Sequence, residues 1–267
     1  MIISRSNVDF NVETVGDIYK ETPLVFLHGF MGSLENWNQI KLQFNIPIIL
    51  IDLPGHGKSH FKKIDNYSFT DWATDFKYIL DKLNLNQINL CGYSMGGRLA
   101  ISFTCRFPMI VNKLILESST PGIDNEIERK NRFETDKLNC TKIMSDYTNF
   151  VEDWCQNIFF ANQKQRNLSG WEAQQEIRLR QNPAQLSSSI EFLGTGKMPS
   201  LWKKINTLHS AVMLITGSED SQYCRIAVEC LKEIKDSKWM NISNCGHNIH
   251  LEQSDQFVEC VKSFLKS

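Results

Sequence analysis

In the first 120 residues, short apolar runs alternate with longer segments whose apolar residues recur every three or four positions. A run of three to six apolar residues bounded by glycine, proline or polar residues is typical of a buried strand, and the longer spacing is typical of an amphipathic helix. The pattern predicts strands at 23–27, 46–51, 88–91 and 114–116, and helices at 35–44, 72–83 and 94–106. Such alternation indicates a mostly parallel sheet with helices on both faces.

This alternation stops near residue 121 and returns near residue 211. The residues between contain no strand-like run of useful length, and they predict helices at 127–144, 147–159, 170–180 and 183–193. Beyond them we expect strands at 211–216 and 238–242 and helices at 224–234 and 255–265. We therefore predict an α/β core domain of residues 1–120 and 201–267, with residues 121–200 as a helical lid insertion, because long insertions in compact domains usually serve binding.

Composition excludes several classes of function. The net charge of −1 argues against a nucleic-acid-binding protein held by a broad basic field. No apolar run approaches the roughly 20 residues that span a bilayer, and Arg5 and Asp9 leave no signal-like apolar stretch at the start. The eight cysteines form no C-x-x-C motif and no zinc-ligand spacing. We expect reduced thiols, a cytoplasmic location, no membrane span and no metal.

The segment Gly92-Tyr93-Ser94-Met95-Gly96 matches the pattern G-x-S-x-G between a predicted strand and a predicted helix. This context is that of a nucleophile elbow, in which the serine stands on a sharp turn. The N–H of Met95 is then directed at an oxyanion, and a second N–H comes from the loop after the first strand. In His28-Gly29-Phe30 we choose Phe30 as that donor.

A serine needs a histidine and an acid to act as nucleophile or base, and in this architecture they follow it in the order acid, then histidine. Asp220 follows the strand that ends near residue 216, and His247 follows the last strand. Both lie at carboxyl ends of parallel strands, where catalytic residues gather. Other candidates remain open, and they are the acids Glu117 and Glu219 and the histidines His28 and His250.

Arginines indicate an anionic substrate. Arg98 lies one helical turn after Ser94 on a helix expected to be buried, where an unpaired guanidinium is costly. It therefore either pairs with an internal carboxylate or reaches into the active site. The insertion holds five more arginines, and two or three of them facing the cleft would suit a substrate with several carboxylates. They are Arg129, Arg132, Arg166, Arg178 and Arg180.

Several segments, spread almost end to end, also carry a family resemblance. They are Phe26–Ser33, Asp52–Gly57, Gly92–Arg98, Pro121–Gly122, Glu128-Arg129 with Arg132 and Asp136, and Gly246–His250. These segments resemble the α/β-hydrolase superfamily and, within it, the family of 2-succinyl-6-hydroxy-2,4-cyclohexadiene-1-carboxylate (SHCHC) synthases of menaquinone biosynthesis. The resemblance implies an α/β-hydrolase fold with a helical lid, and a lyase that eliminates pyruvate from a cyclohexene bearing an enolpyruvyl ether and three carboxylates.

The resemblance also assigns residues. Ser94, Asp220 and His247 would form a catalytic triad without metal or organic cofactor. Arg98, Arg132 and Arg180 would hold carboxylates of the small-molecule tricarboxylate substrate, and Tyr93 and Trp154 would line the pocket. Two alternatives stay open: a serine hydrolase of esters or carbon–carbon bonds, and a ligand-binding receptor on the same scaffold.

Overall fold

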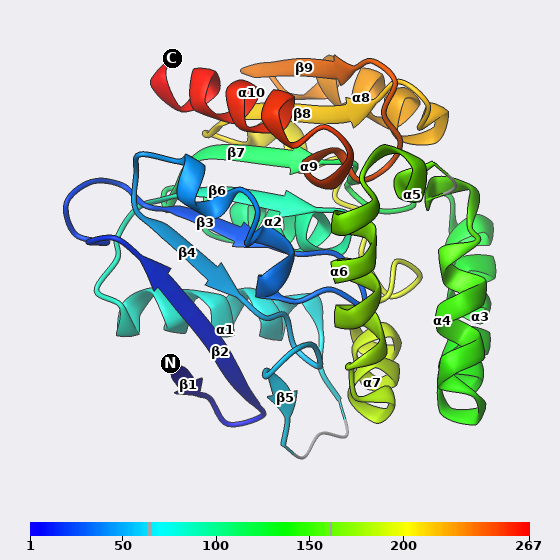
Figure 1. The fold of residues 1–267 in the computed structure, drawn as a ribbon. Coiled ribbons are helices and arrows are strands. Elements are labelled where there is room, and N and C mark those ends of the chain that lie inside the picture. The colour runs from blue at the N-terminus through cyan, green and yellow to red at the C-terminus, as the bar shows by residue number, and fades with distance from the viewer. Residues whose placement is uncertain (63–65, 161) are drawn as a thin grey trace.

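The computed structural model describes residues 1–62, 66–160 and 162–267, and its centre is one twisted sheet (Figure 1). Within the described residues the sheet has nine strands in the order β1-β2-β4-β3-β6-β7-β8-β9, with β5 paired to β2. The strands are β1 (Ile2–Ser4), β2 (Val8–Val15), β3 (Leu24–Leu27), β4 (Ile48–Ile51), β5 (His60–Phe61), β6 (Ile88–Tyr93), β7 (Val111–Glu117), β8 (Ala211–Gly217) and β9 (Ser237–Ile242). The six strands from β4 to β9 along this order are parallel, and β1, β2 and β5 pair antiparallel.

Helices cover both faces of the sheet. One face packs against α1 (Phe69–Lys82), α2 (Met95–Arg106) and α8 (Ser221–Glu233), with side chains such as Trp72, Leu99 and Ala227 in a single core. The other face packs against η1 (Leu34–Trp37), α9 (Ile249–Glu252) and α10 (Ser254–Lys266). This two-sided cover explains why β3, β4 and β6 are continuous buried runs rather than alternating ones.

The predicted α/β-hydrolase fold is confirmed, with differences in single elements; for example, the helix predicted at 147–159 ends at Cys155 and the 3₁₀ helix η3 (Ile158–Phe160) follows it. The predicted helix at 35–44 is wrong, because the chain forms two short 3₁₀ helices, η1 and η2 (Lys41–Gln43). A capping box at Ser33 starts η1, which turns Leu34 and Trp37 into the core beside Phe26. The antiparallel strands β1, β2 and β5 were not predicted, although most of β2 alternates buried and half-buried positions.

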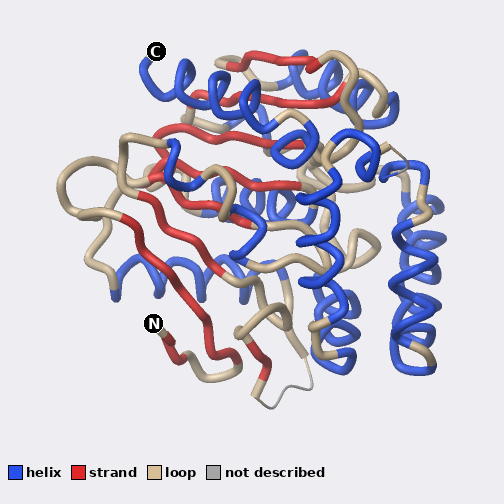
Figure 2. Tube along the Cα trace, in the orientation of Figure 1, coloured by secondary structure: helices blue, strands red, loops and turns tan. Residues whose placement is uncertain are grey.

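The segment predicted as an insertion contains helices and, in its described residues, no strand. They are α3 (Glu126–Ser145), α4 (Tyr147–Cys155), η3 (Ile158–Phe160), α5 (Gln163–Arg166), α6 (Leu168–Leu179) and α7 (Pro183–Leu193), before η4 (Ile205–Thr207). Figures 1 and 2 show them gathered at the end of the sheet to which β6, β7 and β8 point. The division into core and lid remains a prediction.

Two further expectations concern the chain as a whole. Across the described ranges, we find no helix that is both long enough and apolar enough to cross a membrane. All eight cysteines lie in these ranges and are free thiols.

Candidate active site

Ser94 stands on the sharp turn between β6 and α2. Its backbone φ of 49° and ψ of −106° are rare for a residue with a side chain, which is the strain expected of a nucleophile elbow. The turn also brings neighbouring backbone segments very close together. A Cβ at Gly96 would lie 2.2 Å from the carbonyl oxygen of Leu27, so this position requires glycine.

The structure brings Ser94, His247 and Asp220 together in a hydrogen-bonded chain. Nε2 of His247 lies 3.1 Å from Oγ of Ser94, and Nδ1 lies 2.6 Å from Oδ2 of Asp220. The other carboxylate oxygen of Asp220 accepts the N–H of Tyr223 and thereby caps α8. Because both oxygens are engaged and the side chain is buried, the carboxylate is fixed in its orientation toward His247.

The other candidate acids have different partners. Both oxygens of Glu117 bind His250, which donates its backbone N–H and its ring Nδ1–H, and both residues are buried. Glu219 faces Arg166 and Asn162. Neither carboxylate contacts His247 in the described residues, so geometry singles out Asp220.

His28 is a structural histidine. Its Nδ1–H donates to the carbonyl of Gly29 at 2.7 Å, and its Nε2 accepts the N–H of Leu53 at 2.9 Å. An imidazole that accepts a backbone N–H must be neutral there. Burial agrees with this, since it lowers the pKa of His28 to about 4.

The predicted oxyanion donors both border the pocket in front of Ser94. Phe30 follows β3, and Met95 is the first residue of α2, where helix N–H groups lack intrahelical partners. In the described part of the chain no acceptor takes the N–H of either residue. These two N–H groups are therefore available to stabilise a developing negative charge.

The pocket at Ser94 has a volume of about 220 Å³ and combines aromatic and cationic walls. It is lined by Phe30, Ser94, Met95, Arg98, Arg132, Thr135, Asn139, Trp154, Asn157, Phe159, Phe160, Ile190, Gly194, Thr195, Tyr223 and His247. The sequence analysis did not name Tyr223, whose ring lies 4.6 Å from that of His247. The sequence did contain a signal for Tyr223: it lies three residues after Asp220, and the residue that caps a helix lies close to the first turn of that helix.

Arg98 faces this pocket rather than an internal acid. Its side chain is buried and its Nη1 donates to the carbonyl of Leu193 at 2.9 Å, yet no carboxylate of the described residues lies within 4.0 Å. Burial, with a smaller contribution from the nearby Arg132, lowers the pKa of Arg98 to about 10. Arg132 itself pairs with Asp136 at 2.8 Å. Among the described residues, Arg98 is therefore a buried cation of this pocket that forms no ion pair.

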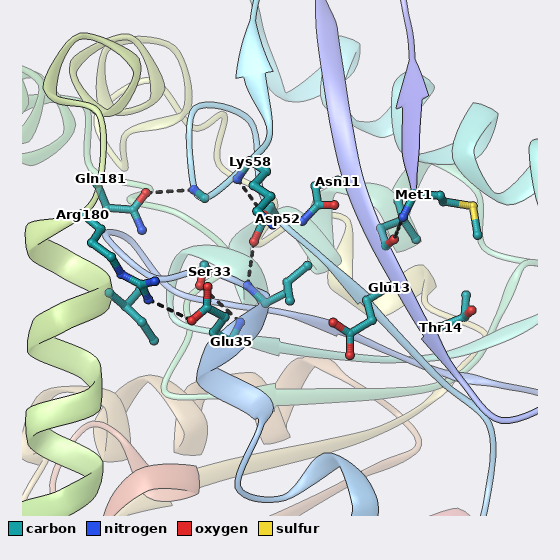
Figure 3. Close-up of a pocket in the computed structure, with 14 residues that line it drawn as sticks. Met1, Asn11, Glu13, Thr14, Ser33, Glu35, Asp52, Lys58, Arg180 and Gln181 are labelled. Atoms are coloured by element: carbon teal, nitrogen blue, oxygen red, sulfur yellow. Dashed lines mark hydrogen bonds and ion pairs between the residues drawn. The ribbon is translucent and has the colours of Figure 1, made fainter.

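Tyr93 and Arg180 do not line this pocket. The Tyr93 ring lies beneath it, packed between the rings of His247 and His250. Arg180 points into a separate polar hollow of about 590 Å³, where it pairs with Glu35 at 2.8 Å (Figure 3). Arg178, in α6, and Arg180, just after it, thus differ in exposure: Arg178 is 3% exposed, whereas the Arg180 side chain is 60% exposed.

Comparison with known proteins agrees with this fold. The family model for the α/β hydrolase fold matches residues 22–254, and the chain belongs to that family. A Bacillus subtilis protein described as a putative SHCHC synthase is 36% identical over 248 residues, which cover 91% of this chain and 90% of that protein. An SHCHC synthase from Citrobacter koseri is 30% identical over 91% of this chain and 93% of its own length.

Solved structures with the same fold were also found. MenH from Staphylococcus aureus superposes with a TM-score of 0.89 at 31% identity, covering 98% of each chain. An enol-lactonase from Burkholderia xenovorans superposes with a TM-score of 0.87 at 15% identity, which shows the common fold alone. Family and relatives together support an enzyme.

Proposed function

We propose that this protein is a carbon–oxygen lyase that eliminates pyruvate from 2-succinyl-5-enolpyruvyl-6-hydroxy-3-cyclohexene-1-carboxylate and so forms SHCHC in menaquinone biosynthesis. The observation that carries the proposal is the buried, unneutralised Arg98 beside a hydrogen-bonded Ser94–His247–Asp220 chain. Two relatives described as SHCHC synthases, each matching about nine-tenths of this chain, supply the substrate. We further propose a cytoplasmic enzyme that needs no cofactor.

In the mechanism, His247 takes the proton of Ser94, and the serine oxygen removes a proton from the substrate ring. The electrons of that C–H bond form a ring double bond, and the C–O bond to the enolpyruvyl group breaks. The proton that His247 took from Ser94 balances the charge of the leaving enolpyruvate, which is protonated and becomes pyruvate. Asp220 orients His247 and stabilises its charged form, and the N–H groups of Phe30 and Met95 stabilise negative charge as it develops.

Binding of the carboxylates follows from the pocket wall. Arg98 and Arg132 offer guanidinium groups that can bind carboxylates bidentately, and Trp154 supplies an aromatic face against the ring. The helices of residues 121–200 would act as the lid that excludes water. Since Arg132 already pairs with Asp136, we assign the larger share of carboxylate binding to Arg98.

Replacing Arg98 with alanine is expected to weaken catalysis of the tricarboxylate by roughly 2–4 kcal/mol, because the lost contact is charged and partly desolvated. Lysine should rescue the loss only in part, since it lacks the bidentate fork. Hydrolysis of a small neutral aryl ester should be nearly unchanged. Both kcat/KM values and the melting temperature test this, and equal losses in both reactions with a lowered melting temperature would make Arg98 a structural residue instead.

Of the two neighbouring arginines, we now expect Arg178 to matter more than Arg180. Arg178 is buried and has only neutral partners among the described residues: the side chain of Gln174, the thiol of Cys155 and the ring of Phe160, which lines the pocket. Arg178→Ala should raise KM for the tricarboxylate by roughly tenfold or more. Arg180→Ala should have little effect, since it loses an exposed ion pair. Steady-state measurement of KM for both variants tests this prediction. A larger rise in KM for Arg180→Ala than for Arg178→Ala would support the role that the family resemblance gives to Arg180.

The proposal is tested by measuring pyruvate release from the enolpyruvyl substrate and comparing it with burst hydrolysis of an aryl ester. The lyase predicts rapid pyruvate release that depends on Ser94. A serine hydrolase predicts an ester burst without pyruvate release, and a receptor predicts binding with very slow turnover. Either of these results would overturn the lyase.

A further inference from the structure

A single arginine of the insertion contacts both loops that carry the acid and the histidine of the triad. Arg166, at the end of α5, directs its Nη2 at Oε1 of Glu219 and its Nη1 at Oε2 of Glu252, the latter at 2.5 Å. Glu219 immediately precedes Asp220, and Glu252 ends α9, five residues after His247. One guanidinium therefore joins three segments that lie far apart in the sequence.

Glu252 and Glu219 are each connected to the loop of His247 by a further bond. Oε2 of Glu252 also accepts the N–H of Gly246 at 2.8 Å, and Gly246 directly precedes His247. The backbone N–H of Glu219 donates to the carbonyl of Cys245 at 3.0 Å, which ties the Asp220 loop to the His247 loop. A shift of either residue would therefore move the backbone that sets the Asp220–His247 distance.

Neighbours of Arg166 strengthen the same contact. Nδ2 of Asn162 donates to Oε2 of Glu219, and Nδ2 of Asn167 donates to the carbonyl of Leu251, each at 2.9 Å. Residues 162–167 thus reach both loops by three separate side chains. Such a set fixes this short segment on the core domain much more firmly than one exposed ion pair would.

Burial makes the arginine necessary to Glu252. The Glu252 side chain is 1% exposed and that of Arg166 is 18% exposed, so the pair is largely withdrawn from water. Hydrogen bonding to Arg166 also lowers the pKa of Glu219 below its ordinary value. Removing one partner of a buried pair leaves an uncompensated charge, which the surrounding loops relieve by moving.

We propose that Arg166 is a positioning residue that holds the Asp220 loop and the His247 loop at the spacing that their hydrogen bond requires. The inference rests on the proposed catalytic role of Asp220 and His247. Arg166 acts through Glu219 and Glu252, because it lies outside the pocket at Ser94. Without its guanidinium the two loops lose a common partner and the Asp220–His247 hydrogen bond loosens, so that Arg166 is coupled to the geometry of the catalytic pair.

The test compares Arg166→Ala with Arg166→Lys and with Arg225→Ala as a matched control. Arg225 is an exposed arginine that borders the same hollow of about 320 Å³ as Arg166, Asp220 and His247, and it makes no ion pair in the described residues. Arg166→Ala should lower kcat by roughly ten- to hundredfold, because small misplacements of catalytic groups are costly, with less than about a threefold change in KM. Arg166→Lys should restore part of the lost kcat, and Arg225→Ala should have the kcat and KM of the unchanged protein.

A spectroscopic readout separates this inference from the proposed reaction. The proton between His247 and Asp220, in a bond of 2.6 Å, should give a far-downfield resonance in the proton NMR spectrum, assigned by its loss in Asp220→Asn. In Arg166→Ala it should shift upfield or broaden. If pyruvate release fails in the unchanged protein, the proposed reaction is wrong, yet this resonance still tests the coupling.

Two results would overturn the coupling. One is a folded Arg166→Ala protein with an unchanged resonance and unchanged kcat, whatever its melting temperature. The other is a raised KM at unchanged kcat, which would reduce Arg166 to an anchor of the insertion. If Arg166→Ala fails to fold, Glu219→Gln replaces it, because that side chain is 40% exposed and its loss leaves the Glu252 contact in place. A several-fold lower kcat with a shifted resonance is then expected, and no change in either would overturn the proposal.

Discussion

Replacing Ser94 with alanine is expected to lower kcat for pyruvate release by at least about 10³-fold while the fold survives. The oxygen of this hydroxyl removes the substrate proton in the proposed mechanism, and its one hydrogen-bond partner among the described residues is Nε2 of His247 at 3.1 Å. Alanine keeps the Cβ that the elbow already accommodates, so the turn with its φ of 49° should persist. Steady-state kinetics measure the loss of kcat, and circular dichroism shows whether the variant is folded.

Ser188→Ala is the matched control for this loss of a hydroxyl. Ser188 lies on α7, and its hydroxyl bonds only to the carbonyl of Ala184 in the described residues. It should keep full activity. A folded Ser94→Ala protein with turnover close to that of the control would remove the serine from the mechanism and leave His247 as the direct base.

The second large effect is expected from Asp220→Asn, which should lower kcat by roughly 10³- to 10⁴-fold. The carboxylate accepts the Nδ1 proton of His247, and this fixes the tautomer whose Nε2 can take the proton of Ser94. An amide that presents its NH₂ group would favour the opposite tautomer. Because the other oxygen still caps α8, the variant should fold, and its kinetics and melting temperature should separate the two roles.

Glu117→Gln and Glu219→Gln are the comparison variants for the acid. Each removes a carboxylate that was a candidate on sequence grounds, and neither contacts His247. Both should reduce kcat much less than Asp220→Asn does. A larger loss in Glu117→Gln would show that the buried Glu117–His250 pair, rather than Asp220, supplies the charge on which catalysis depends.

Much of the site could be predicted because its signals are local in the sequence. The elbow is a five-residue motif between a strand and a helix, and its glycines are required by close backbone contacts. The parallel sheet then places the ends of β6, β8 and β9 at one edge, so three residues distant in sequence had to meet there. The choice of acid needed the structure, since three acids follow strands and only packing shows their partners.

The sequence by itself determined the strand–helix order, the elbow and the excess of arginines, because hydrophobic periodicity and turn residues act over a few positions. Only the tertiary structure decided that Arg98 and Arg132 line the pocket, and which arginine near the end of α6 is buried. Arg178 and Arg180 lie about 200° apart on a helix, and nothing local says which side meets the core. The same holds for residues 35–44, where the burial of Trp37 against Phe26 outweighed helical spacing. The physical reason is the same in both cases. The free energy gained by burying a side chain comes from contacts with distant segments, and no short window of sequence contains both partners of such a contact.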